Sequence, residues 1–339
     1  MAATPTQHSS WIRAWLGSFE PAYDVRIVVV GPVDQPRAVA PLVTRRKGLG
    51  RLELISVREL GEPVGVLSDG DPRSLADVGR ALIELGEPLL LQRLTAQSPL
   101  VAALRSSPAR ALILERPSVP YSYIDLDPSW AEPDARVSAR RRGDLRRKHR
   151  AAERLGPLAL EDCKPAPAEL DPLLEETLRI EASGWKGRAG TALVHDRARA
   201  AFYRSYLRFA AADGLVRIFF LRVGDRRVAT QVYAEFARRL WQIKIGYDEA
   251  FARVSPGMLL SREVIGAAAR DGLDGLEFLG AVEPWTQTWS PTVRRFLTVR
   301  VYPLGLRRLG ALRGLATVWV DAREAWHGRR QARGGTSRR

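Results

Sequence analysis

The 339-residue sequence predicts a mixed α/β fold made of two similar halves, each long enough to bury its own core. In both halves, short β-rich runs joined by Gly, Pro and Asp lead into a helix and then a further short strand. Two landmarks recur at nearly equal offsets. Residues 39–40 match residues 228–229 at an offset of 189, and Gly86 matches Gly272 at an offset of 186. A period of this size indicates one ancestral domain used twice rather than a solenoid.

The first half begins with β-rich runs that a turn containing Gly31, Pro32 and Asp34 interrupts. Apolar residues then recur at helical spacing over residues 74–85, with Ser74 as the predicted N-cap and Gly86 as the predicted C-cap. The predicted strands of this half are residues 25–30, 38–43, 51–57 and 88–91.

The second half repeats the same order of elements. A long helix rich in arginine over residues 133–156 and a strand with a proline-rich loop over residues 157–172 precede it. The predicted helices are residues 173–182, 196–212 and 255–270, the second of them capped by Asp196. The predicted strands are residues 215–223, 228–236, 240–247 and 276–279.

The net charge of +15 is concentrated in two places. Residues 136–150 carry a net charge of +7 and residues 323–339 carry +5, which leaves +3 for the rest of the chain. Basic runs of this kind favour nucleic acid, an anionic lipid or a phosphorylated ligand. A solvated helix face and an unfolded tail are the alternative, because only five of the 53 cationic residues are lysine and a coding preference for arginine lengthens such runs.

Several classes of protein are excluded by composition. A single cysteine, Cys163, permits no intramolecular disulfide and no cysteine-built metal cluster. The four histidines are scattered, so no metal site is expected. The amino terminus lacks the apolar core of a signal peptide, and the apolar runs are too short to span a membrane. We therefore expect a cytoplasmic protein without a transmembrane segment.

One candidate site lies where a predicted strand leads through a loop into a helix, over residues 241–260. Ser255 suits an N-cap, Pro256 suits the first helical position, and Gly257 removes a side chain from the first turn. The exposed N–H groups and the helix dipole form an anion site, to which Arg253 adds a cation. The alternative is an ordinary well-capped helix start.

Two further segments contain residues suited to chemistry. Trp185 and Lys186 lie in a glycine-rich loop that could close over a ligand, or that could be a plain connection between helices. Glu283 and Trp285 follow a predicted strand end, where ligands of α/β sheets often bind. Glu283 would serve as a general base if burial raised its pKa, and Asp248 is the reserve candidate. An exposed capping acid beside core tryptophans is the alternative.

These segments together resemble a known family. Residues 184–193 (GWKGRAGTAL), 243–260 (IKIGYDEAFARVSPGMLL), 277–289 (EFLGAVEPWTQTW) and the basic helix at 138–156 are similar to the GNAT-fold acyltransferases associated with bacterial cellulose and exopolysaccharide synthesis. That family is related to the Fem-type peptidoglycan transferases. The resemblance covers roughly residues 11–302 and is strongest after residue 135.

The resemblance implies transfer of an acyl group from acyl-coenzyme A to an amine or hydroxyl. It places the donor's pyrophosphate on the loop of Arg253, Ser255, Gly257 and Met258, and it places the thioester carbonyl against the strand at Lys244 and Ile245. Trp185, Lys186 and Trp285 would then lie on the side of the acceptor, which would be a small molecule, a glycan or a peptide.

The resemblance also implies a division of the chain. Residues 1–132 would be a degenerate first half, because the loop Asp69-Gly70-Asp71-Pro72 carries two carboxylates that repel a pyrophosphate. Residues 133–172 would be a basic connecting helix and linker, 173–322 the acyltransferase half, and 323–339 a disordered basic tail. Two other functions stay open: a Fem-type transferase that uses aminoacyl-tRNA held by the basic helix, and a non-catalytic RNA-binding protein on the same fold.

Overall fold

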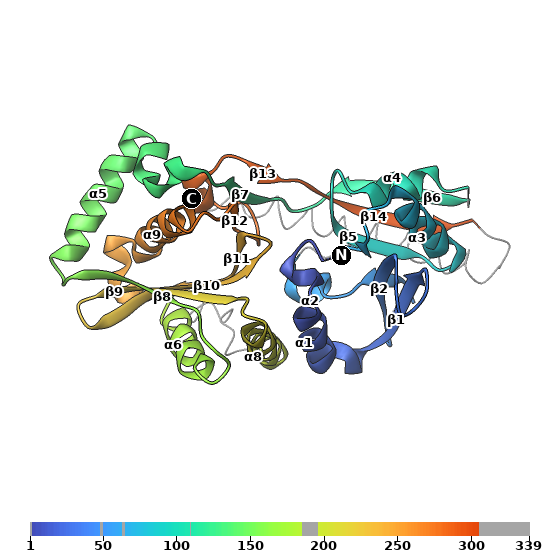
Figure 1. Ribbon diagram of the computed structural model, residues 1–339, viewed down its shortest axis with the longest axis horizontal. Helices are drawn as coiled ribbons and strands as arrows, with labels where there is room; N and C mark the ends of the chain where they lie inside the picture. The colour runs from blue at the N-terminus through green and yellow to red at the C-terminus, as the bar shows by residue number, and fades with distance from the viewer. Residues whose placement is uncertain (1, 48–49, 63–64, 109, 185–195, 305–339) are drawn as a thin grey trace, which may run out of the picture.

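A computed structural model describes residues 2–47, 50–62, 65–108, 110–184 and 196–304, and it shows two mixed sheets of seven strands each (Figure 1). The predicted mixed α/β class is therefore confirmed, whereas the basic tail at 323–339 lies outside these residues. The first sheet has the order β1 (Tyr23–Val30), β2 (Ala38–Arg45), β3 (Leu52–Leu54), β5 (Leu89–Thr95), β14 (Phe296–Pro303), β6 (Ala111–Pro117), with β4 (Leu67–Ser68) on β2. The second has the order β13 (Val293–Arg294), β7 (Tyr121–Asp125), β12 (Gly275–Glu277), β11 (Arg239–Tyr247), β10 (Arg226–Phe236), β9 (Val216–Val223), β8 (Leu158–Cys163).

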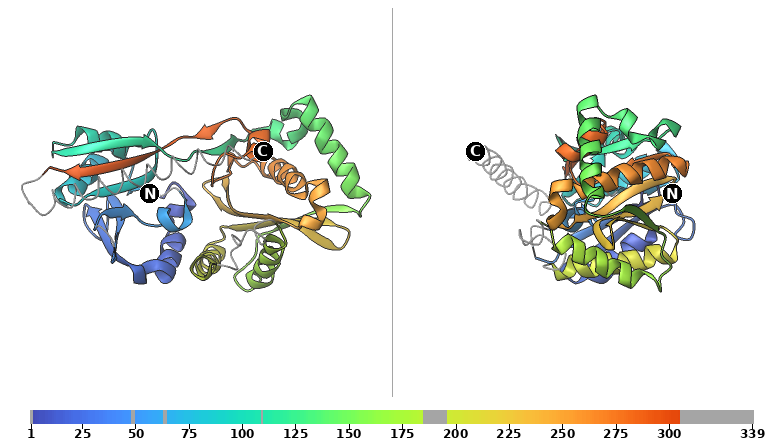
Figure 2. Two further views of the ribbon diagram at one scale, coloured as in Figure 1. Left: turned by 180° about the vertical axis from the view of Figure 1, so that it is seen from behind. Right: turned by 90° about the vertical axis from the view of Figure 1, so that its left-hand side faces the viewer.

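Helices cover the sheets. On the second sheet, α5 and α9 lie over one face and α6 and α8 over the other (Figures 1 and 2). The α-helices are α1 (Ser9–Phe19), α2 (Val57–Leu60), α3 (Pro72–Glu84), α4 (Pro99–Ser106), α5 (Ala139–Glu153), α6 (Leu170–Ala182), α8 (Arg197–Ala212), α9 (Pro256–Arg270) and α10 (Pro284–Trp289). The 3-10 helices are η1 (Pro5–Gln7), η2 (Glu20–Ala22), η3 (Pro128–Ala131), η4 (Pro133–Arg136) and η6 (Glu249–Val254).

Both sheets follow one topology. In each, antiparallel strands lead to one parallel pair, β3 with β5 or β11 with β12, and the chain between those two strands contains α3 or α9. The halves also exchange a strand. β14 from the second half lies between β5 and β6, and β7 from the first half lies between β12 and β13. This reciprocal exchange supports the predicted repeat.

The alignment of the halves differs from the predicted one. Helix α3 begins at Pro72 and α9 begins at Pro256, so the equivalent helices are 184 residues apart. Gly257 is therefore equivalent to Arg73 rather than to Asp71, and Asp71 is equivalent to Ser255. The shift of two residues arises within the helices, because α3 has 13 residues and α9 has 15.

One apolar core is shared by the two halves. Trp11 of α1 lies edge-on against Phe202 and Tyr206 of α8, with ring centroids 4.9 and 4.8 Å apart. Its indole N–H donates to Ser56 in a bond of 2.9 Å. Large buried aromatic pairs contribute strongly to such contacts. The halves consequently pack as one unit, with α1 beside α8 in Figure 1.

Two local predictions about the first half were wrong. Asp71, not Ser74, caps α3, because its carboxylate accepts the Arg73 N–H at 2.9 Å and the helix begins at Pro72. The strand predicted over residues 51–57 ends at Leu54, because Ser56 has a φ of +82° and Val57 opens α2. Sequence patterning also missed α1, α4, β6 and β7, whereas every strand and helix predicted for the second half is present.

Candidate active site

The parallel strands of the second sheet part after a short pairing. β11 and β12 pair only from Arg239 opposite Gly275 to Trp241 opposite Glu277, and β11 then continues to Tyr247. In the ranges that the structure describes, no strand pairs with the remainder of this edge of β11. An extended edge of this kind is suited to hydrogen bonding with a ligand's polar backbone.

A β-bulge in β11 sets where its side chains point. Val232 of β10 pairs with Lys244 and Tyr233 pairs with Gln242, so Ile243 is the extra residue. Lys244 then lies on the side of α8, with Nζ 4.1 Å from the centroid of the Tyr203 ring. Ile245 follows, opposite Gln231 in the register.

The end of β11 leads directly to the predicted anion loop. Ser255 occupies the N-cap position of α9, Pro256 occupies the first turn as predicted, and Met258 packs against the second core. The expected hydroxyl cap is absent, because Ser255 has a φ of +52° and its side chain caps no N–H. A Cβ at Gly257 would meet only the Tyr247 ring at 3.7 Å, so the first turn has room beside it.

The basic helix borders this loop. Leu145 and Ala152 anchor α5 in the core, while Ala139 and most of the arginines of this helix are exposed. The Lys148 ammonium donates to the carbonyl of Arg253 at 2.5 Å, and the Arg253 side chain is exposed. A cationic surface therefore adjoins the start of α9. A surface hollow of about 440 Å³ on α5 is lined by Arg140, Arg141, Gly143, Asp144 and Arg147.

The two acids predicted as general bases have structural partners. Glu283 is exposed at the N-cap of α10, so the burial on which its role depended is not observed. Asp248 is buried, but it accepts the Ala250 N–H at 3.0 Å and an Arg226 N–H at 3.0 Å. The catalytic roles of Glu283 and Asp248 remain predictions.

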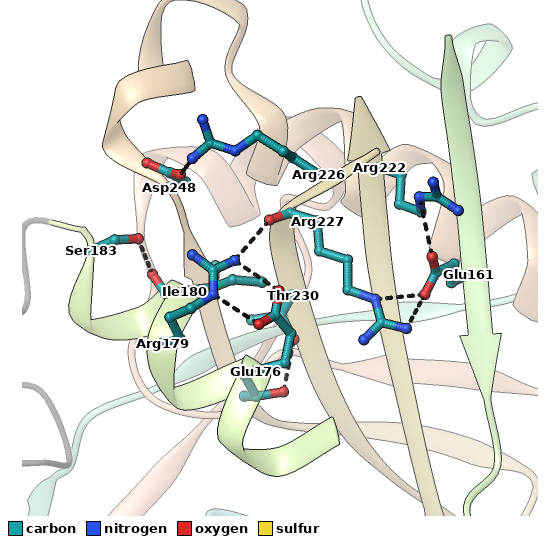
Figure 3. A network of polar contacts seen from close by, with 11 residues as sticks. Glu161, Glu176, Arg179, Ile180, Ser183, Arg222, Arg226, Arg227, Thr230 and Asp248 are labelled. Carbon is teal, nitrogen blue, oxygen red and sulfur yellow. Dashed lines mark hydrogen bonds and ion pairs between the residues drawn. The ribbon is translucent and has the colours of Figure 1, made fainter. Parts of the chain in front are cut away.

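Figure 3 shows that Asp248 belongs to a set of ion pairs on the sheet face that carries α6. Arg179 of α6 pairs with Glu176 at 2.7 Å and also donates to the carbonyl of Arg227. Arg227 pairs in turn with Glu161 of β8 at 2.6 Å. These contacts join α6 to β10 and β10 to β8. We therefore assign a structural role to these ion pairs.

The predicted acceptor residues are only partly observed. Trp185 and Lys186 lie outside the described residues. Trp285 is half-buried and stands perpendicular to the Phe278 ring, with centroids 5.5 Å apart. It packs against the core of the second half at the end of β12. No group of side chains that could hold a metal ion occurs among the residues described.

Sequence analysis missed a buried polar cluster between the halves. Arg93 of β5 donates to the carbonyl of Gly280, which follows β12, at 2.9 Å and also to the carbonyl of Gly61. The Gly280 N–H donates to the Glu62 carboxylate, and Glu62 is only 8% exposed. Burial raises the pKa of Glu62 to about 7 against the lowering effects of Arg93 and Lys244. No sequence pattern marks this glutamate, because Arg93, Lys244 and Gly280 lie far from it in the sequence.

The comparisons agree with this architecture. Residues 139–287 match the family described as acetyltransferase (GNAT) domain, and no curated protein matches the sequence. FemX is similar in structure, with a TM-score of 0.58 and 11% identity over 88% of this chain and 92% of FemX. The C-terminal domain of a putative lysylphosphatidylglycerol synthetase from Agrobacterium fabrum has a TM-score of 0.55 and 12% identity over 91% and 89% of the two chains.

A conserved protein of unknown function from Bacteroides thetaiotaomicron is also similar, with a TM-score of 0.55 and 13% identity over 86% and 89% of the two chains. At these identities the likeness shows the fold, and it extends over both halves. Residues 139–287 therefore match a GNAT acetyltransferase domain, and the two-sheet fold that contains them is similar to that of FemX.

Proposed function

We propose that this protein is an acyltransferase that moves an acyl group from acyl-coenzyme A to an amine or hydroxyl. The observation that supports it best is the path from the part of β11 that continues beyond its pairing with β12 to the first turn of α9, inside the region that matches the GNAT domain. One end of that path suits a thioester carbonyl, and the other suits a pyrophosphate.

The donor residues follow from this geometry. The backbone at Lys244 and Ile245 would polarise the thioester carbonyl, and the turn from Ser255 through Gly257 to Met258 would hold the pyrophosphate at the positive end of the α9 dipole. Arg253 and the arginines of α5 would add positive charge for the remaining phosphate. We propose that the second half binds the donor and that the first half shapes the acceptor site.

Calorimetric titration with acetyl-coenzyme A and longer acyl-coenzyme A species tests the proposal. We expect one binding site per chain, a raised melting temperature, and release of free coenzyme A thiol when an acceptor is added. Failure of every species to bind would contradict the proposal. The acceptor class proposed is a small molecule, a glycan or a peptide, with exopolysaccharide precursors in the cytoplasm as the first compounds to test.

A second candidate is transfer from aminoacyl-tRNA. The exposed arginines of α5 beside the α9 loop favour it, because an RNA backbone requires such a surface. Only charged tRNA should then stabilise the protein and support transfer. If uncharged RNA binds equally well and the binding survives substitution of Gly257, a non-catalytic RNA-binding role is favoured instead.

A further inference from the structure

We propose that Glu62, which the first half supplies, is the base that receives the acceptor's proton at the active site of the second half. This inference rests on the proposed acyltransferase function. It assigns a catalytic residue that lies outside the GNAT-matched region, since that region begins at residue 139.

The position of Glu62 is set by both halves. Arg93 bridges the carbonyls of Gly61 and Gly280, two residues that are far apart in sequence. The Gly280 N–H in turn donates to the Glu62 carboxylate. Because Gly280 follows the end of β12, these hydrogen bonds place Glu62 beside the point where β11 and β12 separate.

Two residues at these hydrogen bonds, Arg93 and Leu279, have a strained backbone. Arg93 has a φ of +54° within β5, and Leu279 has a φ of +50° just before Gly280, although neither is a glycine. Left-handed conformations at non-glycine residues persist where the surrounding structure enforces them, and they concentrate at functional sites. The strained residues here are Arg93, which donates to the carbonyl of Gly61, and Leu279, which precedes the Gly280 N–H that contacts Glu62.

The cluster contains buried polar atoms that the described residues do not satisfy. Glu62 Oε2, Arg93 Nε and the Tyr206 hydroxyl are all buried, and none of them has a hydrogen-bond partner among those residues. A buried polar group without a partner is costly, and most buried polar groups are therefore paired. Two such atoms, on Arg93 and Tyr206, around a carboxylate that has an unsatisfied oxygen of its own indicate a site built for a polar ligand.

The charged and titratable groups around Glu62 come from four elements. They are Arg93 of β5, Lys244 of β11, Tyr121 of β7, and Tyr203 and Tyr206 of α8. Burial raises the pKa of Glu62 to about 7, while the two cations lower it. Burial also raises the pKa of each tyrosine well above its usual range, so the tyrosines stay neutral. Glu62 is thus the group here that changes charge near neutral pH.

The chemical step balances with Glu62 as base. The acceptor's nitrogen or oxygen forms a bond to the thioester carbonyl carbon, and the C–S bond then breaks with its electron pair on sulfur. The proton of the acceptor passes to the Glu62 carboxylate and later to solvent, while the departing thiolate takes a proton from solvent. A base whose pKa lies near the working pH is the most effective for such a transfer.

Glu62 meets the requirements that Glu283 and Asp248 do not. Glu283 is exposed at a helix start, and Asp248 is paired with Arg226 and the N–H of Ala250. Glu62 is buried, has one oxygen without a hydrogen-bond partner among the described residues, and interacts electrostatically with Lys244 of the strand that would carry the thioester.

Kinetics of Glu62→Gln test the assignment. The assay follows release of coenzyme A thiol from acetyl-coenzyme A, with L-lysine, glucosamine or water as acceptor, from pH 5 to pH 9. We expect kcat to fall at least about a hundredfold, the rise of rate through about pH 7 to disappear, and acetyl-coenzyme A affinity to stay within about threefold. Glu84→Gln is the matched control, because Glu84 is an exposed carboxylate of the same half, and it should behave as the wild type.

The outcomes separate the two proposals. A wild type that neither binds nor consumes acetyl-coenzyme A would overturn the acyltransferase function and this inference with it. An active wild type whose folded Glu62→Gln variant keeps its rate and pH profile would overturn the role of Glu62 alone, and loss of rate in Glu283→Gln would then favour Glu283. If Glu62→Gln does not fold, Glu62→Asp decides: a slower rate with the pH rise retained supports the base, and an unchanged rate overturns it.

Discussion

Helices α3 and α9 occupy equivalent places in the two sheets, yet they begin in different ways. At α3, Asp71 accepts the Arg73 N–H at 2.9 Å, while Asp69 accepts the Asp71 N–H at 3.0 Å and the Ser74 hydroxyl at 3.1 Å. At α9, the Ser255 side chain caps nothing and no acidic residue lies in the first turn.

The difference shows how one repeated unit can acquire two roles. The positive end of α3 already holds carboxylates of its own chain, so a phosphate would meet repulsion there. The start of α9 leaves that place to a ligand. The first half has carboxylates where the second half has an open helix start, and it supplies Arg93 and Glu62, which contact the second half.

The largest expected effect comes from making α9 resemble α3. Gly257→Asp should weaken binding of acetyl-coenzyme A roughly a hundredfold, since two charges 5 Å apart interact by about 3 kcal/mol at an effective dielectric constant of 20. The fold should survive, because a Cβ at Gly257 makes an ordinary contact with Tyr247 at 3.7 Å. Titration calorimetry measures the affinity, with Gly257→Ala as the uncharged control. Equal affinities for the two variants would remove the loop from the donor site.

The buried carboxylate of the first half should also appear in the pH dependence of stability. The pKa of Glu62 is about 7 in the folded protein and 4.5 in a model peptide, so the folded state binds the extra proton between these values. The contribution of Glu62 to the free energy of unfolding is full below about pH 4.5 and is lost as pH rises through 7. Its size is on the order of 3 kcal/mol.

Urea unfolding at pH 5 and pH 8 checks this expectation. Glu62→Gln carries no titrating group, so its stability relative to the wild type should rise between the two pH values. An equal stability difference at both pH values would show that Glu62 titrates normally and would weaken the contrast with the solvent-facing carboxylates of α3.

The smallest effect is expected from neutralising the two carboxylates at the start of α3. Asp69→Asn with Asp71→Asn should leave turnover and the stoichiometry of one donor per chain unchanged, because these carboxylates hold no donor. Loss of the charged cap should lower stability by about 1 kcal/mol at most, since asparagine also caps helices. Thermal unfolding and calorimetry measure the two quantities, and a second donor site or a clear loss of activity would contradict the asymmetry of the halves.

The elements of the second half could be predicted because their signals are local. The alternation of β9 to β11, the Asp196 cap of α8 and the Pro256 start of α9 each depend on a few neighbouring residues, and all are present. The resemblance of these same segments to the GNAT fold followed for that reason, and it is matched over residues 139–287. The sequence by itself determined the mixed α/β class, the two halves and the basic helix.

Tertiary structure alone decided how the halves complete each other. Neither the exchange of β7 and β14 nor the hydrogen bond from Arg93 to the Gly280 carbonyl is marked by a local sequence pattern, because each joins segments that are distant in the sequence. Burial likewise separated the acids: Glu283 is exposed, and Glu62, which no spacing marks, is enclosed. Short-range periodicity specifies which face of an element is apolar, whereas the pairing of faces and the desolvation of a carboxylate depend on the whole packed chain.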